Sequence, residues 1–305
     1  MTLTHTRRGL TAIAGIAAIA LAITGCSVSP EPDPEAAETE APAEGWTVEF
    51  NQAAADLLPA EVAEAGKILV GGEDGRAPFR FVEDGELTGI EVDIMEAIGD
   101  VLGLEIQYEN ISGLAPTLLA LSSERVDVAF GPFRPNPDRQ REFDYVNFMI
   151  DGNGYLTLAD DDRIQTTPDD ICGLTIAYLE SSNAADYLAG VTEKCVAAGE
   201  EPVDGQGVSS NESMMLGVLS ARYDAATTAS PLGRYAASQN EELRWIEDPD
   251  RGTATLGSLT SKLRPEMGAA LFAAYEQLFE QGVLAKIMAK WGQEDAMTDE
   301  PTRLD

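Results

Sequence analysis

Histidine is almost absent from this sequence of 305 residues, which contains only His5. We expect His5 to lie in an N-terminal leader that is removed, so the mature chain would contain no imidazole. That absence excludes Ser-His-Asp and Cys-His catalysis and every zinc site that needs a histidine ligand. The three cysteines are too few for a four-cysteine metal site. We therefore expect no metal and no cofactor, and acid–base chemistry would fall to carboxylates, lysine, tyrosine or serine.

Positive charge is also scarce, with 20 Lys and Arg against 53 Asp and Glu and a formal net charge of −33. Such a field repels nucleic acid and anionic membrane surfaces, so we expect no nucleic-acid partner. The composition is otherwise that of a soluble globular protein, because 44% of the residues are hydrophobic and 24% are charged. The length allows a large core and predicts two lobes or domains.

The N-terminus indicates an export signal. Arg7 and Arg8 precede an apolar run at 10–23 that is short for a membrane span. The run ends in Ile-Thr-Gly-Cys, which resembles the lipobox of bacterial lipoproteins and predicts a signal peptide at 1–25 and lipidation of Cys26. The alternative is an ordinary secretory signal followed by a chance cysteine.

Residues 26–45 are expected to hold the lipidated cysteine and a disordered acidic tether. Four prolines, six acids and almost no large apolar residue cannot form a core. A lipid anchor, a tether and a globular body together indicate a protein held at the extracytoplasmic face of a cell membrane. The lipid would be its only membrane contact, because the acidic body is repelled by anionic lipid.

From Trp46 onward, short apolar strands alternate with amphipathic helices. The first run predicts strands and helices in turn at 67–70, 89–101, 104–108, 114–121 and 126–130. The second run predicts such elements at 174–178, 183–188, 213–219, 224–228, 231–238, 265–280 and 283–291. Short connections favour largely parallel sheets covered on both faces, and two runs favour two lobes. Ligand crevices lie beyond the carboxyl ends of such strands, so those of two lobes can face each other.

Several segments of this body resemble the extracellular solute-binding proteins of ABC importers, the polar amino-acid type called family 3. The resemblance covers residues 50–293. Its carriers include APFRF at 77–81, LTGIEVDIMEAIGDVLGL at 87–104, RVDVAF at 125–130, ICGLTIAYLESSN at 171–183 and LFEQGVLAKIMAKWG at 278–292. It implies an α/β, two-lobed, periplasmic-binding-protein-like fold of type II. Each lobe would be a mostly parallel sheet flanked by helices, and two hinge crossings would join the lobes.

The resemblance implies lobe one at 46–153 and 252–305 and lobe two at 154–251. The crossings would lie near 152–157 and 248–257, where glycines either absorb backbone rotation or form plain turns. The expected function is capture of an amino acid or a related small carboxylate in the interlobe cleft. The expected partner is an ABC transporter permease, and the protein is expected to be a monomer.

The resemblance also places a ligand site in the cleft. Arg139 occupies the position of the family's carboxylate-binding arginine, whose planar fork suits a ligand carboxylate. The alternative is a surface arginine paired with Asp138 or Glu142. Glu73 stands where the family commonly has an acid, which could take a ligand ammonium group. Arg76 replaces an aromatic residue that stacks on the ligand in many relatives.

Further candidates of lobe one follow the strand at 126–130. Gly131, Phe133 and Arg134 match the family's strand-end loop, which offers backbone groups to the ligand. Phe130 is an apolar wall of the cleft or a core residue. Arg134 is the third arginine expected near the cleft, and three cations there would suit an acidic ligand.

Lobe two contributes a turn and a strand end. Ser181, Ser182 and Asn183 match the family's turn at a helix N-terminus, where they hold an anion, cap the helix, or do both. Thr228 lies where relatives that bind α-amino acids often place an aspartate for the ammonium group. The ligand would therefore lack a free α-ammonium, or Glu73 would bind that group alone.

Cys172 and Cys195 are expected to form a disulfide. An exported protein permits one, and Cys26 would be occupied by lipid. The pattern ICG…C also resembles a cystine found in part of the family.

Two other functions stay open. The same fold hosts cyclic dehydratases, so an enzyme is one alternative, and a non-transport ligand sensor is another. The lack of histidine and of paired acids at the expected cleft favours a binding protein that is not an enzyme. A purely structural lipoprotein would need neither hinge segments nor Arg139.

Overall fold

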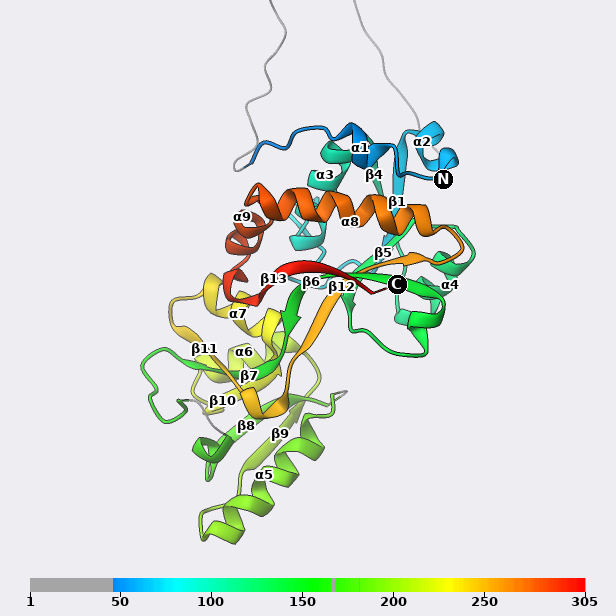
Figure 1. Ribbon diagram of the computed structural model, residues 1–305. Helices are drawn as coiled ribbons and strands as arrows, with labels where there is room; N and C mark the ends of the chain where they lie inside the picture. The colour runs from blue at the N-terminus through cyan, green and yellow to red at the C-terminus, as the bar shows by residue number, and fades with distance from the viewer. Residues whose placement is uncertain (1–45, 166–167, 181, 305) are drawn as a thin grey trace, which may run out of the picture. The chain divides into compact units, whose positions relative to one another are not determined.

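The structure, a computed structural model, describes residues 46–165, 168–180 and 182–304 (Figure 1). The predicted signal peptide at 1–25, the lipidated Cys26 and the acidic tether up to residue 45 lie outside the described residues. The site candidate Ser181 lies outside them as well.

Two sheets form the framework of the fold. The larger has six strands in the order β13-β6-β12-β5-β1-β4, with the bounds β1 Lys67–Gly72, β4 Glu105–Asn110, β5 Val128–Phe133, β6 Phe143–Asp151, β12 Ala254–Ser261 and β13 Met297–Leu304. The smaller has five in the order β11-β7-β10-β8-β9, with the bounds β7 Asn153–Leu158, β8 Thr175–Leu179, β9 Asp204–Val208, β10 Ala225–Ala229 and β11 Leu243–Glu247. A hairpin, β2 Phe81–Glu83 and β3 Glu86–Thr88, forms a separate small sheet.

The prediction of mostly parallel sheets is wrong, because both sheets are mixed. β1 is parallel to β4 and β5, whereas β12 is antiparallel to β5 and β6, and β13 is antiparallel to β6. In the smaller sheet β8 is parallel to β9 and β10, and β7 is antiparallel to β10 and β11. Strands joined by crossover helices run parallel, as the alternating pattern predicts. The antiparallel ones belong to segments in which the chain leaves one sheet and later returns to it.

Helices pack on both sheets. The larger sheet and its neighbours carry α1 Gln52–Ala55, α2 Ala60–Ala65, α3 Ile90–Leu102, α4 Leu114–Ser122, α8 Pro265–Glu280 and α9 Val283–Lys290. The smaller sheet carries α5 Ala184–Ala198, α6 Asn211–Leu219 and α7 Ser230–Gln239. Short 3₁₀ turns are η1 Arg139–Arg141, η2 Pro168–Ile171, η3 Pro249–Arg251 and η4 Glu294–Ala296.

The largest apolar cluster lies where α3 and α8 pack together and against the larger sheet. Met267, Leu271, Ala274 and Leu278 follow one face of α8, and all four are buried. Burial of each large aliphatic side chain contributes about 1.5–3 kcal/mol. This core gives β1 and β5 a rigid support, and their carboxyl ends carry many of the site candidates.

The chain passes between the sheets at two places. Gly152 alone separates β6 from β7 on the way out, and η3 with Gly252 lies between β11 and β12 on the way back. Gly252 has a φ of +69°, which glycine adopts without strain. The strands thus change sheets close to the lobe boundaries expected at 153/154 and 251/252, which stay predictions.

Two of the glycines near these crossings are required by close strand packing. A Cβ atom on Gly154 would lie 2.1 Å from the carbonyl oxygen of Ile246, which is in the neighbouring β11. A Cβ atom on Gly257 would lie 2.0 Å from the carbonyl oxygen of Val146, which is in β6. The absence of a side chain at both positions is therefore explained by the approach of the paired strands.

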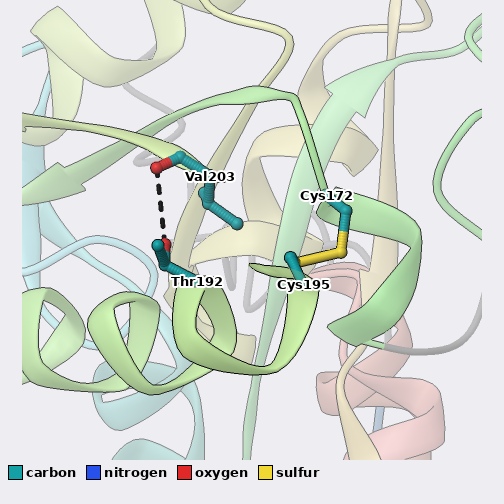
Figure 2. Close-up of a disulfide and its surroundings, with 4 residues drawn as sticks. All are labelled: Cys172, Thr192, Cys195 and Val203. Carbon is teal, nitrogen blue, oxygen red and sulfur yellow. Dashed lines mark hydrogen bonds between the residues drawn. A yellow bond between two sulfur atoms is a disulfide. The ribbon is translucent and has the colours of Figure 1, made fainter. Parts of the chain in front are cut away.

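The expected disulfide between Cys172 and Cys195 is confirmed (Figure 2). It ties the residue after η2 to α5, across a sequence separation of 23 residues, and the Cys195 side chain is buried. The hydroxyl of Thr192, also in α5, donates a hydrogen bond to the carbonyl oxygen of Val203 at 3.4 Å (Figure 2). Both links attach the C-terminal half of α5 to neighbouring segments.

Replacing both cysteines with serine should lower the free energy of unfolding by about 3 kcal/mol, because the bond restricts a loop of this length in the unfolded chain. Denaturant unfolding followed by circular dichroism measures the change. A reducing agent should destabilise the natural protein equally and leave the double variant unchanged. Equal stability of the oxidised protein and the variant would contradict this account.

Candidate functional site

A cavity of about 250 Å³ lies at the carboxyl ends of β1 and β5. It is lined by residues that follow β1, by the start of α4, by the end of β5 and by η1. The sequence-predicted candidates that line it are Glu73, Arg76, Phe130, Gly131, Phe133, Arg134 and Arg139. The fold therefore brings together all the candidates expected from lobe one.

A second cavity, of about 420 Å³, is lined from both sheets. Ala77 and Phe79 line it from the side of the larger sheet, and Asn153 and Thr228 line it from β7 and β10. The two cavities share Arg76 and Phe79, so they are neighbours. The candidates found in the second cavity are Arg76, Ser182, Asn183 and Thr228.

Arg139 lies half-buried in η1 without a carboxylate within ion-pair distance among the described residues. Its Nη1 donates to the carbonyl oxygen of Arg134 at 3.4 Å. Burial raises the pKa of the Tyr145 hydroxyl, and the neighbouring Arg139 guanidinium partly opposes that rise. Asp138, considered above as a surface partner, lies 3.4 Å from Arg141 instead. The charge of the Arg139 guanidinium is therefore not neutralised by any carboxylate of the described residues.

The other two predicted arginines already have acidic neighbours. The Nε of Arg134 donates to Asp151 at 2.8 Å, and Asp151 is buried. Burial raises the pKa of the Asp151 carboxyl, and Arg134 lowers it. Arg76 lies 3.6 Å from Glu73 in an exposed pair, which costs little to break. The charge of Arg134 is therefore partly neutralised by Asp151. Arg76 and Glu73 can each give up their weak ion pair and contact a ligand instead.

Phe130 lies at the edge between cavity and core. Only 1% of it is exposed, and its ring centroid is 5.7 Å from that of Phe148. Phe133 is half-buried, and a Cβ atom on Gly131 would lie 3.1 Å from its ring. These residues form a rigid apolar end to β5. The polar groups that line the cavity come from the arginines and acids.

The first turn of α5 forms one wall of the second cavity. The hydroxyl of Ser182 donates to the carbonyl oxygen of Leu179 at 2.7 Å and accepts from the Ala184 N–H at 3.2 Å. The side chain of Asn183, the residue before α5, makes no capping hydrogen bond. Ser182 therefore serves as a cap, while Asn183 keeps its amide for another partner.

Sequence reasoning missed Arg80, whose side chain is completely buried. Its Nη1 donates to Glu91 at 2.7 Å, its Nε lies 2.8 Å from Asp74, and its Nη2 donates to the carbonyl oxygen of Glu109 at 3.3 Å. Arg80 therefore fixes the turn after β1 that carries Glu73. The sequence signal for a buried Arg80 is the segment APFRF at 77–81, in which one charged residue stands among apolar ones.

A second missed residue is Arg251, at the end of η3 and in the lining of the second cavity. Its Nη1 donates to the Thr227 hydroxyl at 2.8 Å, and its guanidinium lies 4.4 Å from the ring centroid of Tyr187. Its position inside the expected return crossing at 248–257 was the available signal.

Glu91 lines the first cavity and is buried at the start of α3. Burial raises the pKa of its carboxyl from 4.5 to about 8, although the Arg80 guanidinium acts to lower it. Asp74 is a second carboxyl within ion-pair distance of Arg80, at 2.8 Å from its Nε. The native protein consequently holds a proton at Glu91 that the unfolded chain releases at lower pH.

Because the folded-state pKa of Glu91 is the higher one, its stabilising contribution is complete below about pH 4.5 and is lost as the pH rises through about 8. The free energy of unfolding should fall over this interval by at most about 1.4 kcal/mol per pH unit for one proton. Glu91→Gln should remove this component, as seen by comparing urea unfolding of both proteins across the interval. Glu61→Gln, at an exposed position of α2, is the control and should leave the pH dependence unchanged. Parallel pH curves for Glu91→Gln and the natural protein would refute the assignment.

Within the parts of the chain that the structure describes, no group of three or more His, Cys, Asp or Glu side chains is placed to hold a metal ion. In the same residues, no helix combines the length and the apolar character needed to cross a membrane.

Comparisons with known proteins agree with this architecture. The arginine-binding protein ArgT of Corynebacterium glutamicum is 27% identical over 301 residues, 96% of this chain and 95% of that protein. The L-cystine-binding protein TcyJ of Escherichia coli is 30% identical over 135 residues, 42% of this chain and 48% of that protein. A solved structure of substrate-binding domain 2 of GlnP from Lactococcus lactis, in an open conformation, aligns with a TM-score of 0.63 at 20% identity, over 75% of this chain and 96% of that one.

The two α/β sheets and the structural likeness confirm the expected two-lobed fold of type II, apart from the directions of the strands. Residues 68–294 match the family model of bacterial extracellular solute-binding proteins, family 3. That match spans most of the chain, and the site lies where the strands of both sheets end. The chain therefore belongs to the bacterial extracellular solute-binding proteins, family 3.

Proposed function

We propose that this protein captures an amino acid, or a related small carboxylate, between its two sheets and delivers it to the permease of an ABC importer. The observation that carries the proposal is Arg139, a half-buried arginine that lines a strand-end cavity and has no carboxylate partner among the described residues. Relatives named as arginine- and cystine-binding proteins support an amino acid as the ligand.

Each wall of the cleft has its own role in this proposal. Arg139 binds the ligand carboxylate through two parallel N–H donors. Glu73 accepts hydrogen bonds from the ammonium group once it leaves Arg76. The first turn of α5, with Ser182 and Asn183, supplies N–H groups and an amide to the same carboxylate. Ser181 stays a candidate in that turn by its position in the sequence.

The remaining candidates shape the pocket. Phe130, Gly131 and Phe133 exclude water from the ligand's apolar part, and Thr228 offers a hydroxyl from β10. Arg134 contributes less than Arg139, because Asp151 already holds it.

We propose binding without catalysis. Relatives named as binding proteins support this, and the buried acids Asp151 and Glu91 are engaged with Arg134 and Arg80. A ligand should stabilise the protein against heat and be recovered unchanged after incubation. The protein is proposed to act as a monomer.

Replacing Arg139 with alanine should weaken ligand binding by about 2–5 kcal/mol, because a desolvated carboxylate loses its cation. Arg139→Lys should cost less, since it keeps the charge and loses the planar fork. Calorimetric titration with amino acids, preceded by mass spectrometry of any co-purified small molecule, provides the measurement.

The matched control is Arg141→Ala in the same 3₁₀ turn, because the Arg141 side chain is 78% exposed and pairs with Asp138. It should bind as the natural protein does. Unchanged affinity in Arg139→Ala would remove Arg139 from the site and the proposed function would lose its main support.

We also propose that Cys26 carries a lipid that holds the protein at the extracytoplasmic face of the cell membrane, with residues 27–45 as the tether. The sequence Ile-Thr-Gly-Cys and the Pro- and Glu-rich composition of the following residues support this. Family membership adds support, because these are extracellular proteins.

Cys26→Ser should release the protein from the membrane fraction into the soluble fraction or the medium. Fractionation followed by immunoblotting measures the distribution. Ser27→Ala is the control and should stay with the membrane. Retention of the Cys26→Ser protein in the membrane would place the anchor elsewhere.

A further inference from the structure

We infer that Arg251 binds a second carboxylate of the ligand, so that the preferred substrate is an amino acid whose side chain ends in a carboxylate. The inference rests on the proposed function, in which Arg139 binds the first carboxylate. It concerns a different residue, on the return segment between the sheets, that lines the second cavity.

Arg251 is held in place by contacts that leave its charge unneutralised. One Nη donates to the hydroxyl of Thr227, which is buried in β10, and the guanidinium stacks on Tyr187 of α5. Of the five N–H donors of the guanidinium, one has a partner in the described structure. The planar group is therefore oriented by two neighbours and keeps free donors for a planar, bidentate acceptor.

Two acids closely precede Arg251 in the sequence: Asp250, which is exposed and forms no ion pair among the described residues, and Asp248, which is occupied by other donors. Asp248 is buried and accepts from the hydroxyls of Tyr187 at 2.6 Å and Tyr155 at 3.2 Å. Its other oxygen accepts from the Asp250 N–H at 3.1 Å. No carboxylate of the described residues lies within ion-pair distance of the Arg251 guanidinium. Because Arg251 also lines a cavity, its unpaired charge is open to an acceptor that comes from outside.

The acids that share the second cavity are already satisfied. Asp151 accepts from Arg134, and Glu212 lies in the first turn of α6, where Ser210 and its own backbone N–H lower the pKa of its carboxyl. Apart from Arg76, which lies 3.6 Å from Glu73, the remaining polar lining consists of hydroxyls and amides, including Asn153, Asn183 and Thr228. Arg251 is therefore a cation of this cavity that no protein carboxylate neutralises, and an anionic side chain can contact it while Glu212 keeps its own hydrogen bonds.

The two unpaired arginines of the cleft lie in neighbouring cavities that meet at Arg76 and Phe79. A ligand with a carboxylate at each end would contact both sheets at once. Binding would then bridge Arg139 on one wall and Arg251 on the other. A single-carboxylate ligand would leave Arg251 desolvated without an anion when it is bound.

The test begins with a thermal-shift screen of the common protein amino acids and L-cystine on the purified protein. Calorimetry then compares L-glutamate with L-glutamine and L-aspartate with L-asparagine, pairs that differ by one charge. We expect a side-chain diacid to bind at least about 30-fold more tightly than its amide. Arg251→Gln should abolish that preference by weakening the diacid, and the affinity for the amide should change by less than about threefold. Arg251→Lys should give an intermediate preference.

Arg222→Gln is the matched control. Arg222 is an exposed arginine shortly before β10, and its guanidinium lies 5.1 Å from the ring centroid of Tyr223. It lines neither cavity. It should keep the preference. Melting temperatures of all variants separate a binding effect from loss of folding, and Arg251→Lys serves where Arg251→Gln does not fold.

The outcomes are distinguishable. Tightest binding of a neutral or cationic amino acid, or an unchanged preference in Arg251→Gln, overturns the role of Arg251 and leaves the proposed function standing if Arg139→Ala still weakens binding. A protein that binds no amino acid overturns the proposed function and this inference with it.

Discussion

Arg80 and the two acids around it hold the turn on which one side of the ligand cleft is built. Its guanidinium is completely buried between Glu91 of α3 and Asp74 of the turn after β1. A buried charge that lost its partner would cost about 3–5 kcal/mol, so the three groups must stay together. Because Asp74 is fixed in this way, its neighbours Glu73 and Arg76 are held at the rim of the first cavity.

The same pairing rule separates the arginines of the cleft into two groups. Arg134 is bound to Asp151, and Arg76 has Glu73 nearby, so their charges are partly used within the protein. Arg139 and Arg251 each donate a hydrogen bond, and Arg251 also stacks on the ring of Tyr187. Neither forms an ion pair among the described residues. With acids in large excess over bases, selective pairing determines which cations stay available for a ligand.

Much of the architecture could be predicted from the sequence, because it was encoded locally. The helical period at 265–280 predicted α8 at Pro265–Glu280, and the helix expected at 89–101 is α3 at Ile90–Leu102. The strands β2, β3, β6, β7, β9, β11, β12 and β13 were not predicted. The residues of β6 are almost all buried and show no alternation, so a periodic pattern could not reveal it. Antiparallel pairing at the crossings depends on where the chain returns, which no local pattern encodes.

The sequence by itself determined the family, the two α/β runs, the disulfide partners and the arginine expected to bind a carboxylate. Local periodicity predicted the two runs, whereas the family and the role expected of Arg139 came from the resemblance of several segments to the family, and the disulfide from the cysteine count together with that resemblance. Only the tertiary structure decided which charges are paired, because Arg134 meets Asp151 across 17 residues and Arg80 meets Glu91 across 11. It also placed Arg251 beside Thr227 and Tyr187, which lie far from it in the chain. Availability of a charge depends on neighbours in space, and those neighbours exist only once both sheets have formed.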